Sequence, residues 1–155
     1  MVALLLAVVA MVVTPHFADF LARRQLETAC RQAVETVAFA RDWAREHGQA
    51  VLVTWDTGSV TLSVQSPEDG EFIPLTGSPE AHLRLPEQVS VAWLEQGEEE
   101  PELPFAAAIY PDGRADDLAV NLEDEAGHVR RLEWRGNLGV VSLVPEDQVR
   151  REDVE

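Results

Sequence analysis

The chain has 155 residues, 46% of them apolar, which suits one ordinary globular domain and excludes a disordered chain. Its 28 acidic residues face 12 basic ones, all arginine, giving a net charge of −16. Residues 1–50 hold five acids and five arginines, so the excess, twenty-three acids against seven arginines, lies in residues 51–155. This acidic part repels phosphate backbones and anionic lipid headgroups, so it predicts solubility or a basic protein partner rather than nucleic-acid binding.

The first thirteen residues (MVALLLAVVAMVV) are almost purely aliphatic. A membrane-spanning helix needs roughly 20 apolar residues, and although no charge precedes Asp19, Pro15 and His16 interrupt the apolar run. A signal peptide is one competing interpretation, but no basic residue precedes the run, and a buried core helix is another. We expect a membrane anchor whose first residues are missing, with a bend at Pro15.

From Asp19 to about His47, apolar residues recur at three- and four-residue steps, which predicts an amphipathic helix. Gly48 is its predicted end, because glycine accepts the left-handed conformation at a helix C-terminus. A helix from residue 1 to about 47 would be roughly 70 Å long at about 1.5 Å per residue, more than a small domain can cover. We therefore expect its N-terminal half to lie in a membrane or against other subunits, and its apolar stripe to pack on the following domain. The stripe consists of Leu26, Cys30, Ala33, Val37, Ala40 and Ala44.

After Gly48, short alternating segments separated by turn residues predict a mostly antiparallel β-sheet domain. Pro74 places its strand at an edge or a bulge. Residues 76–86 are expected to form a turn-rich connection and residues 95–104 an acidic loop. The expected strands are residues 51–55, 60–64, 72–75, 89–94, 105–110, 118–122, 129–134 and 140–144.

No group of residues has the spacing of a catalytic, cofactor-binding or metal site, so we expect no enzyme activity and no cofactor. The lone Cys30 cannot form an intramolecular disulfide and is expected to be a small buried hydrophobe. The histidines at positions 16, 47, 82 and 128 match no hydrolase triad or metal motif. The four tryptophans, Trp43, Trp55, Trp93 and Trp134, are expected to anchor the core between helix and sheet.

Six acidic residues near the end of the domain are candidates for a calcium site, because hard cations need several oxygen ligands. Their spacing fits no ligand loop, and acidic turns are usually solvated. We therefore expect no metal there. The six are Asp112, Asp116, Asp117, Glu123, Asp124 and Glu125.

Four features in this order resemble a known family. They are the apolar segment ending at Pro15, the Ala-rich helix of residues 38–44 (AFARDWA), the strand directly after Gly48, and the block IYPDGR at residues 109–114 followed by closing strands. This arrangement resembles the type IV pilin-like minor pseudopilins. It is most similar to the H-type minor pseudopilins of type II secretion, the GspH/FimT-like family.

The chain departs from that family at its beginning. The family's mature chain starts with a Phe-Thr-Leu-Ile-Glu-like block, preceded by a short basic leader that a prepilin peptidase removes before methylating the new N-terminus. This sequence enters at Met1-Val2-Ala3 and shows neither the leader nor the block. Either the start was assigned too far downstream or the chain is a degenerate member of the family, and we expect the true start to lie upstream.

The resemblance implies an α+β pilin-like fold: residues 1–24 form a transmembrane and filament-packing helix, residues 25–145 a globular domain, and residues 146–155 a charged flexible tail. It implies a single-pass inner-membrane protein with its domain in the periplasm, acting as a structural subunit of the pseudopilus that drives type II protein export. The implied partners are other pseudopilins and inner-membrane secretion components, membrane lipid and secreted proteins, but no nucleic acid. Two alternatives stay open: a minor pilin of a type IV pilus or DNA-uptake system, and a membrane-tethered β-rich binding module.

Overall fold

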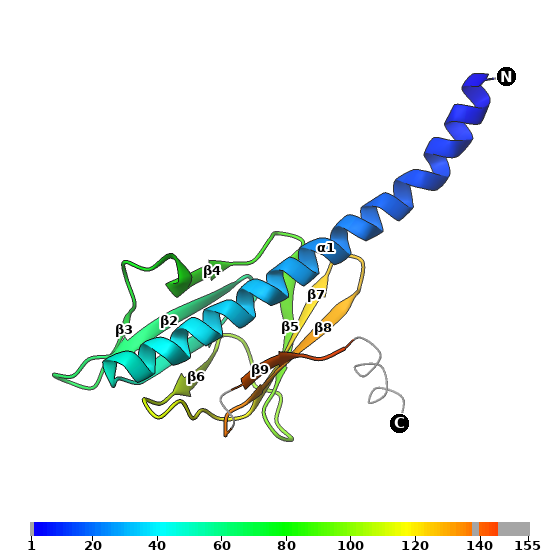
Figure 1. Cartoon of the computed structure of the whole chain (residues 1–155). Helices are drawn as coiled ribbons and strands as arrows, with labels where there is room; N and C mark the ends of the chain where they lie inside the picture. The colour runs from blue at the N-terminus through cyan, green and yellow to red at the C-terminus, as the bar shows by residue number, and fades with distance from the viewer. Residues whose placement is uncertain (1, 138–139, 146–155) are drawn as a thin grey trace.

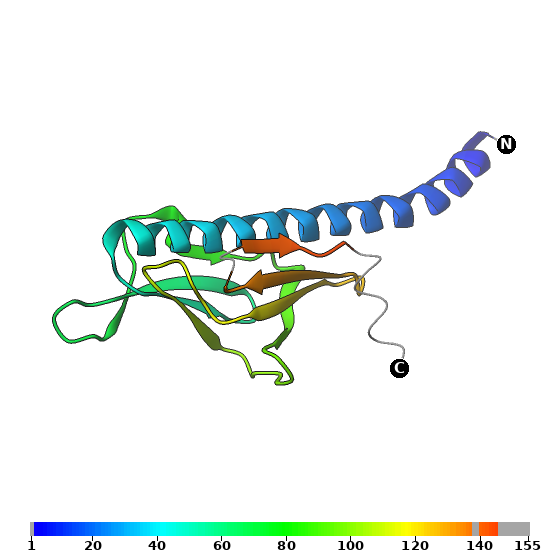
Figure 2. The ribbon, with the colours of Figure 1, turned by 60° about the horizontal axis from the view of Figure 1, so that its bottom comes forward.

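The computed structural model describes the backbone of residues 2–137 and 140–145, and the side chains of residues 16–137 and 141–145. Its dominant element is α1 (Val2–His47), a single helix that runs without interruption through Pro15. The N-terminal part of α1 curves and projects beyond the rest of the molecule (Figures 1 and 2). The helix ends as predicted, with Gly48 in the left-handed conformation at a φ of 63°.

The rest of the described chain forms two sheets, both antiparallel as predicted. The first has the order β3-β2-β1-β6, with β4 also pairing with β2, and the second has the order β5-β7-β8-β9. The strands are β1 (Val51–Trp55), β2 (Ser59–Gln65), β3 (Phe72–Pro74), β4 (His82–Arg84), β5 (Val89–Glu95), β6 (Phe105–Ile109), β7 (Leu118–Asp124), β8 (Val129–Arg135) and β9 (Val140–Leu143).

Each predicted strand has a counterpart, and β3 lies at a sheet edge as Pro74 indicates. The prediction for residues 76–86 is wrong in part, because this connection contains a 3₁₀ helix (Pro79–Ala81) and the strand β4. Three residues are too few to show an alternating pattern. Strand β4 forms because His82, Leu83 and Arg84 pair with Thr61, Val60 and Ser59 of β2.

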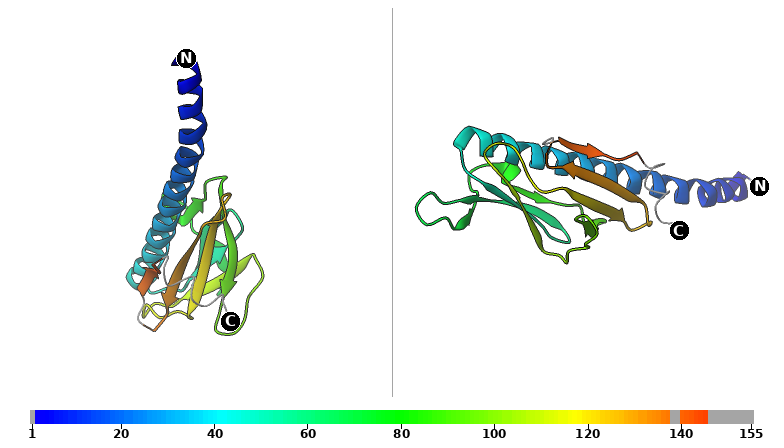
Figure 3. Two further views of the ribbon diagram at one scale, coloured as in Figure 1. Left: turned by 90° about the vertical axis from the view of Figure 1, so that its right-hand side faces the viewer. Right: turned by 90° about the horizontal axis from the view of Figure 1, so that it is seen from below.

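The C-terminal half of α1 lies across both sheets and closes the core against them (Figure 3). The predicted stripe is confirmed, since all six of its residues are buried and Ala29 is buried with them. Four of these seven residues are alanines, whose small side chains let the helix approach the strands closely. The helix therefore serves as the spine of the domain.

The tryptophans divide into two pairs. Trp55 and Trp134 are buried in the core, as predicted. Trp43 and Trp93 are only half-buried: Trp43 stacks on His47 with ring centroids 4.0 Å apart, and Trp93 donates from Nε1 to Glu95 Oε1 at 3.0 Å. Trp43 nevertheless packs against the core from its edge, so the prediction that all four anchor the core is wrong only for Trp93.

Candidate functional site at the helix exit

The candidate site lies on the stretch of α1 where the helix leaves the two sheets and is no longer covered by them. We call residues 16–25 the helix exit. Among the helix side chains that the structure describes, Leu26 is the first buried one, and every residue of the helix exit is exposed or half-buried. The helix exit is thus a surface, whereas the following turns belong to the core.

The helix exit carries exposed apolar side chains on one face. Phe17 is 60% exposed, Phe20 51% and Leu21 46%. Their spacing of three and four residues places them side by side on the helix, and Arg24 continues the same row. The Arg24 guanidinium lies over the Phe20 ring, 5.2 Å from its centroid. A contiguous apolar face of this kind is typical of a surface that another protein or a membrane covers.

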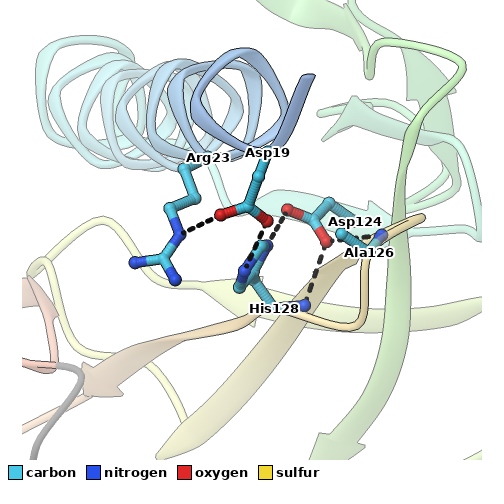
Figure 4. A network of polar contacts seen from close by, with 5 residues as sticks. All are labelled: Asp19, Arg23, Asp124, Ala126 and His128. Atoms are coloured by element: carbon cyan, nitrogen blue, oxygen red, sulfur yellow. Dashed lines mark hydrogen bonds and ion pairs between the residues drawn. The ribbon is translucent and has the colours of Figure 1, made fainter. Parts of the chain in front are cut away.

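A polar network joins the helix exit to the turn between β7 and β8 (Figure 4). His128 lies between two carboxylates: its Nε2 is 3.2 Å from Asp19 Oδ1 and its Nδ1 is 2.7 Å from Asp124 Oδ2. Asp19 also pairs with Arg23, the Oδ2 to Nε distance being 3.4 Å. An imidazole ring can donate to both carboxylates at once only when it is protonated. We call Asp19, His128 and Asp124 the clasp, since they tie the helix to the second sheet.

Asp124 is the fixed end of the clasp. Its side chain is fully buried, and its Oδ1 accepts hydrogen bonds from the backbone N–H groups of Ala126 and His128, both at 2.9 Å. The carboxylate thereby holds the tight turn that aims the His128 ring at the helix. Sequence reasoning missed this role and treated Asp124 as a solvated turn residue. The Asp-Glu-Ala-Gly-His order signals a turn, but pairing with a helix residue over a hundred positions away leaves no local pattern.

Of the six acidic residues considered for a calcium site, three make specific contacts, whereas Asp116 and Glu125 are exposed and Glu123 is half-buried. Asp112 pairs with Arg114, with 2.6 Å between Oδ2 and Nε, and the hydrogen bond from the Arg114 backbone N–H lowers the pKa of its carboxyl. Asp117 accepts a hydrogen bond from the Gly136 N–H at 2.7 Å, and Asp124 belongs to the clasp. Within the described part of the chain, no three His, Cys, Asp or Glu residues are grouped so that they could hold a metal ion.

The turn inside the IYPDGR block is built as its sequence suggests. The Tyr110 N–H donates to the Arg114 carbonyl and the Gly113 N–H to the Tyr110 carbonyl, both at 2.8 Å. Asp112 Oδ1 accepts from the Arg114 N–H at 3.0 Å, which closes the turn from its side chain. The block therefore ends β6 and redirects the chain toward the second sheet.

Cys30 is fully buried in the helix stripe, as predicted. Burial raises the pKa of its thiol to about 12, so the group stays protonated at neutral pH. A protonated buried thiol is a poor nucleophile and a poor metal ligand. Cys30 therefore acts as a small core residue.

One structural finding bears on the expectation that the start of α1 is a membrane anchor. Across the residues that the structure describes, α1 does not combine the length and the apolar character that crossing a bilayer would take.

Comparisons with known proteins identify the fold. No protein-family model matches the chain, and no curated protein matches it in sequence. Among solved structures, it is similar to the minor pseudopilin EpsH of the type 2 secretion system of Vibrio cholerae, with a TM-score of 0.62, 15% identity, and coverage of 77% of this chain and 96% of EpsH.

Two further structures show the same likeness. The E. coli GspH structure has a TM-score of 0.65 at 17% identity, covering 83% of this chain and 94% of GspH. The type IV minor pilin FimU of Pseudomonas aeruginosa has a TM-score of 0.56 at 15% identity, covering 83% of this chain and 94% of FimU. The predicted fold class is therefore confirmed: the chain has the α+β pilin-like fold that minor pseudopilins and minor pilins share.

Proposed function

We propose that the chain is a minor pseudopilin, a structural subunit of the periplasmic pseudopilus that drives protein export by type II secretion. The observation that carries this proposal is the helix exit, where α1 leaves the domain with Phe17, Phe20 and Leu21 exposed in one row. The helix then continues beyond the two sheets with no strand alongside it (Figure 2). An uncovered apolar helix of this length needs partners of similar shape, which a bundle of pseudopilin helices provides.

In this proposal the parts of the chain divide the work. Residues 1–24 pack in the inner membrane and among the helices of other pseudopilins, while residues 25–145 form the domain on the periplasmic side. Residues 146–155, predicted to be a charged tail, lie outside the described residues. The subunit works through assembly, so it needs no catalytic residue and no cofactor.

Site-directed crosslinking tests the proposal. Phe20→Cys and Leu21→Cys place a thiol on the apolar face, and the native Cys30 does not compete because it is fully buried. We expect a short bismaleimide to join these variants to other pilin-like subunits in the native host, identified by mass spectrometry. Glu71→Cys, exposed between β2 and β3, is the matched control. Crosslinks from Glu71→Cys alone would contradict helix-mediated assembly.

The likeness to FimU favours one second candidate, a minor pilin of a type IV pilus. The same crosslinks separate the two, because the captured subunits belong either to a secretion system or to a pilus. The third interpretation, a tethered β-rich binding module, requires that a chain without residues 1–25 keeps its full activity. Loss of function in that truncated chain would argue against it.

A further inference from the structure

A groove of about 200 Å³ lies between the helix exit and the start of β8. Phe20 and Leu26 give it an apolar side, and Arg23, Arg24 and Arg130 give it positive charge. Its volume is several times the ~30 Å³ share of one water molecule, so it can admit a phosphate group. Three arginines around one groove are notable in a chain whose net charge is −16.

Two of these arginines form no ion pair with a carboxylate of the described residues. Arg23 pairs with Asp19 at 3.4 Å, and Glu27, which also lines the groove, is within 3.6 Å of Arg31. Among the described residues, neither Arg24 nor Arg130 takes part in an ion pair. Arg130 is half-buried beside the helix, where an unpaired cation favours an anionic ligand.

The groove also has a definite place along the helix. It adjoins the exposed apolar face, and Arg24 follows Leu21 by three residues, about 5 Å at about 1.5 Å per residue. The headgroup layer on each side of a bilayer is roughly 5–8 Å thick. Aromatic rings and arginines collect at this level in membrane proteins, with the guanidinium group directed to the headgroups.

We propose that this groove binds the phosphate of an anionic phospholipid headgroup. Arg24 and Arg130 donate to the phosphate oxygens, for which the guanidinium fork is well matched, and the exposed ring of Phe20, one turn nearer the N-terminus, contacts the glycerol and upper acyl carbons. The inference rests on the proposed placement of α1 in a membrane. The acidic domain as a whole repels an anionic bilayer, and the groove offsets that repulsion where the domain comes nearest to the lipid.

The test uses the full chain in neutral maltoside micelles, titrated with dihexanoyl phosphatidylglycerol. The readout is the shift of the arginine Nε–H signals in NMR spectra. We expect saturable shifts at Arg24 and Arg130, and about tenfold weaker binding in Arg130→Gln. Arg84→Gln is the matched control, because Arg84 is exposed on β4, away from the groove, and its substitution removes the same charge. Unchanged thermal unfolding of both variants shows that the fold is intact.

Three results would overturn the inference. Equal binding of dihexanoyl phosphatidylcholine would show that the groove does not select an anionic lipid. An equal loss in Arg84→Gln would show that net charge alone attracts the lipid. Saturation by inorganic phosphate at the same concentration would assign the groove to a free anion. Each of these results leaves the assembly proposal standing, because the crosslinks from Phe20→Cys and Leu21→Cys do not depend on Arg130.

Discussion

Gly136 stands where the chain after β8 passes directly over the segment before β7. A Cβ atom at this position would lie 1.6 Å from the Ala115 carbonyl oxygen, and the Gly136 N–H already donates to Asp117 Oδ1 at 2.7 Å. Any side chain would therefore push two backbone segments apart. We expect Gly136→Ala to lower the free energy of unfolding by about 2–4 kcal/mol, measured by urea denaturation.

Gly58 provides the matched control, because a Cβ atom there would meet nothing within 4 Å. Gly58→Ala should change the free energy of unfolding by no more than about 1 kcal/mol, or raise it, since alanine restricts the unfolded chain. Similar losses in the two variants would show that close approach is not the reason for Gly136.

The thiol of Cys30 makes stability depend on alkaline pH. Burial raises its pKa from 9.0 to about 12, so the unfolded chain loses this proton at a lower pH than the folded one. The stabilising contribution is therefore complete below about pH 9 and lost as the pH rises toward 12. We expect the difference in unfolding free energy between the native chain and Cys30→Ala to shrink over that range, by at most about 1.4 kcal/mol per pH unit. A difference that stays constant with pH would contradict burial of the thiol as the cause.

At the scale of elements, the contact between α1 and the sheets depends on small side chains. Ala33 is fully buried in the stripe, whereas its neighbour Gln32 is exposed. Ala33→Leu forces extra carbon atoms between helix and strands, and we expect it to lower the free energy of unfolding by about 1–3 kcal/mol. Gln32→Leu adds an apolar side chain to the outer face and should change it by less than about 0.5 kcal/mol. Chemical denaturation of both variants measures the difference.

The clasp gives a second prediction at this scale. Asp124→Ala leaves the backbone N–H groups of Ala126 and His128 without their buried acceptor, and we expect a loss of about 2–4 kcal/mol in unfolding free energy. Glu125→Ala, at an exposed position one residue later, is the control. Asp19→Ala should cost less than about 1 kcal/mol, because Asp19 is 46% exposed and solvent screens its pairs. A larger effect from Asp19 than from Asp124 would reverse this assignment.

The elements could be predicted where a local pattern encodes them. The stripe of α1, its end at Gly48 and eight of the strands follow from periodicity and turn residues. The split into two sheets could not be read from the sequence, because alternation shows that a segment is a strand but not which partner it takes. Strand β4 and the clasp were not predicted for the same reason, because both depend on pairing between residues that are distant in the sequence.

At the scale of the whole molecule, we expect the stability of the domain not to depend on the projecting start of α1. The backbone at the start of α1 projects beyond the two sheets (Figure 2), and Leu26 is the first buried residue among the helix side chains described. We expect a chain without residues 2–15 to unfold in urea at a midpoint close to that of the full chain, while losing the crosslinks at Phe20→Cys. A large fall in the midpoint would show that the start of α1 stabilises the domain.

The fold of the whole molecule could be predicted from the sequence, whereas the groove could not. The resemblance carried by Gly48 and the IYPDGR block predicted a pilin-like fold, and solved structures at 14–17% identity confirm it. The groove beside the helix exit was not predicted, because Arg130 is more than a hundred residues from Arg24 in the chain. Surfaces made from distant segments become visible only once the segments are placed together.

The alanine-rich contact of α1 has a mechanical consequence. It runs from Leu26 to Ala44 and touches both sheets, and the clasp adds a further attachment at Asp19. A force along the helix axis is therefore distributed as shear over the many contacts between α1 and the two sheets, and no single contact carries it. The helix and the domain must therefore translate and rotate together. The orientation of the domain then follows directly from that of α1.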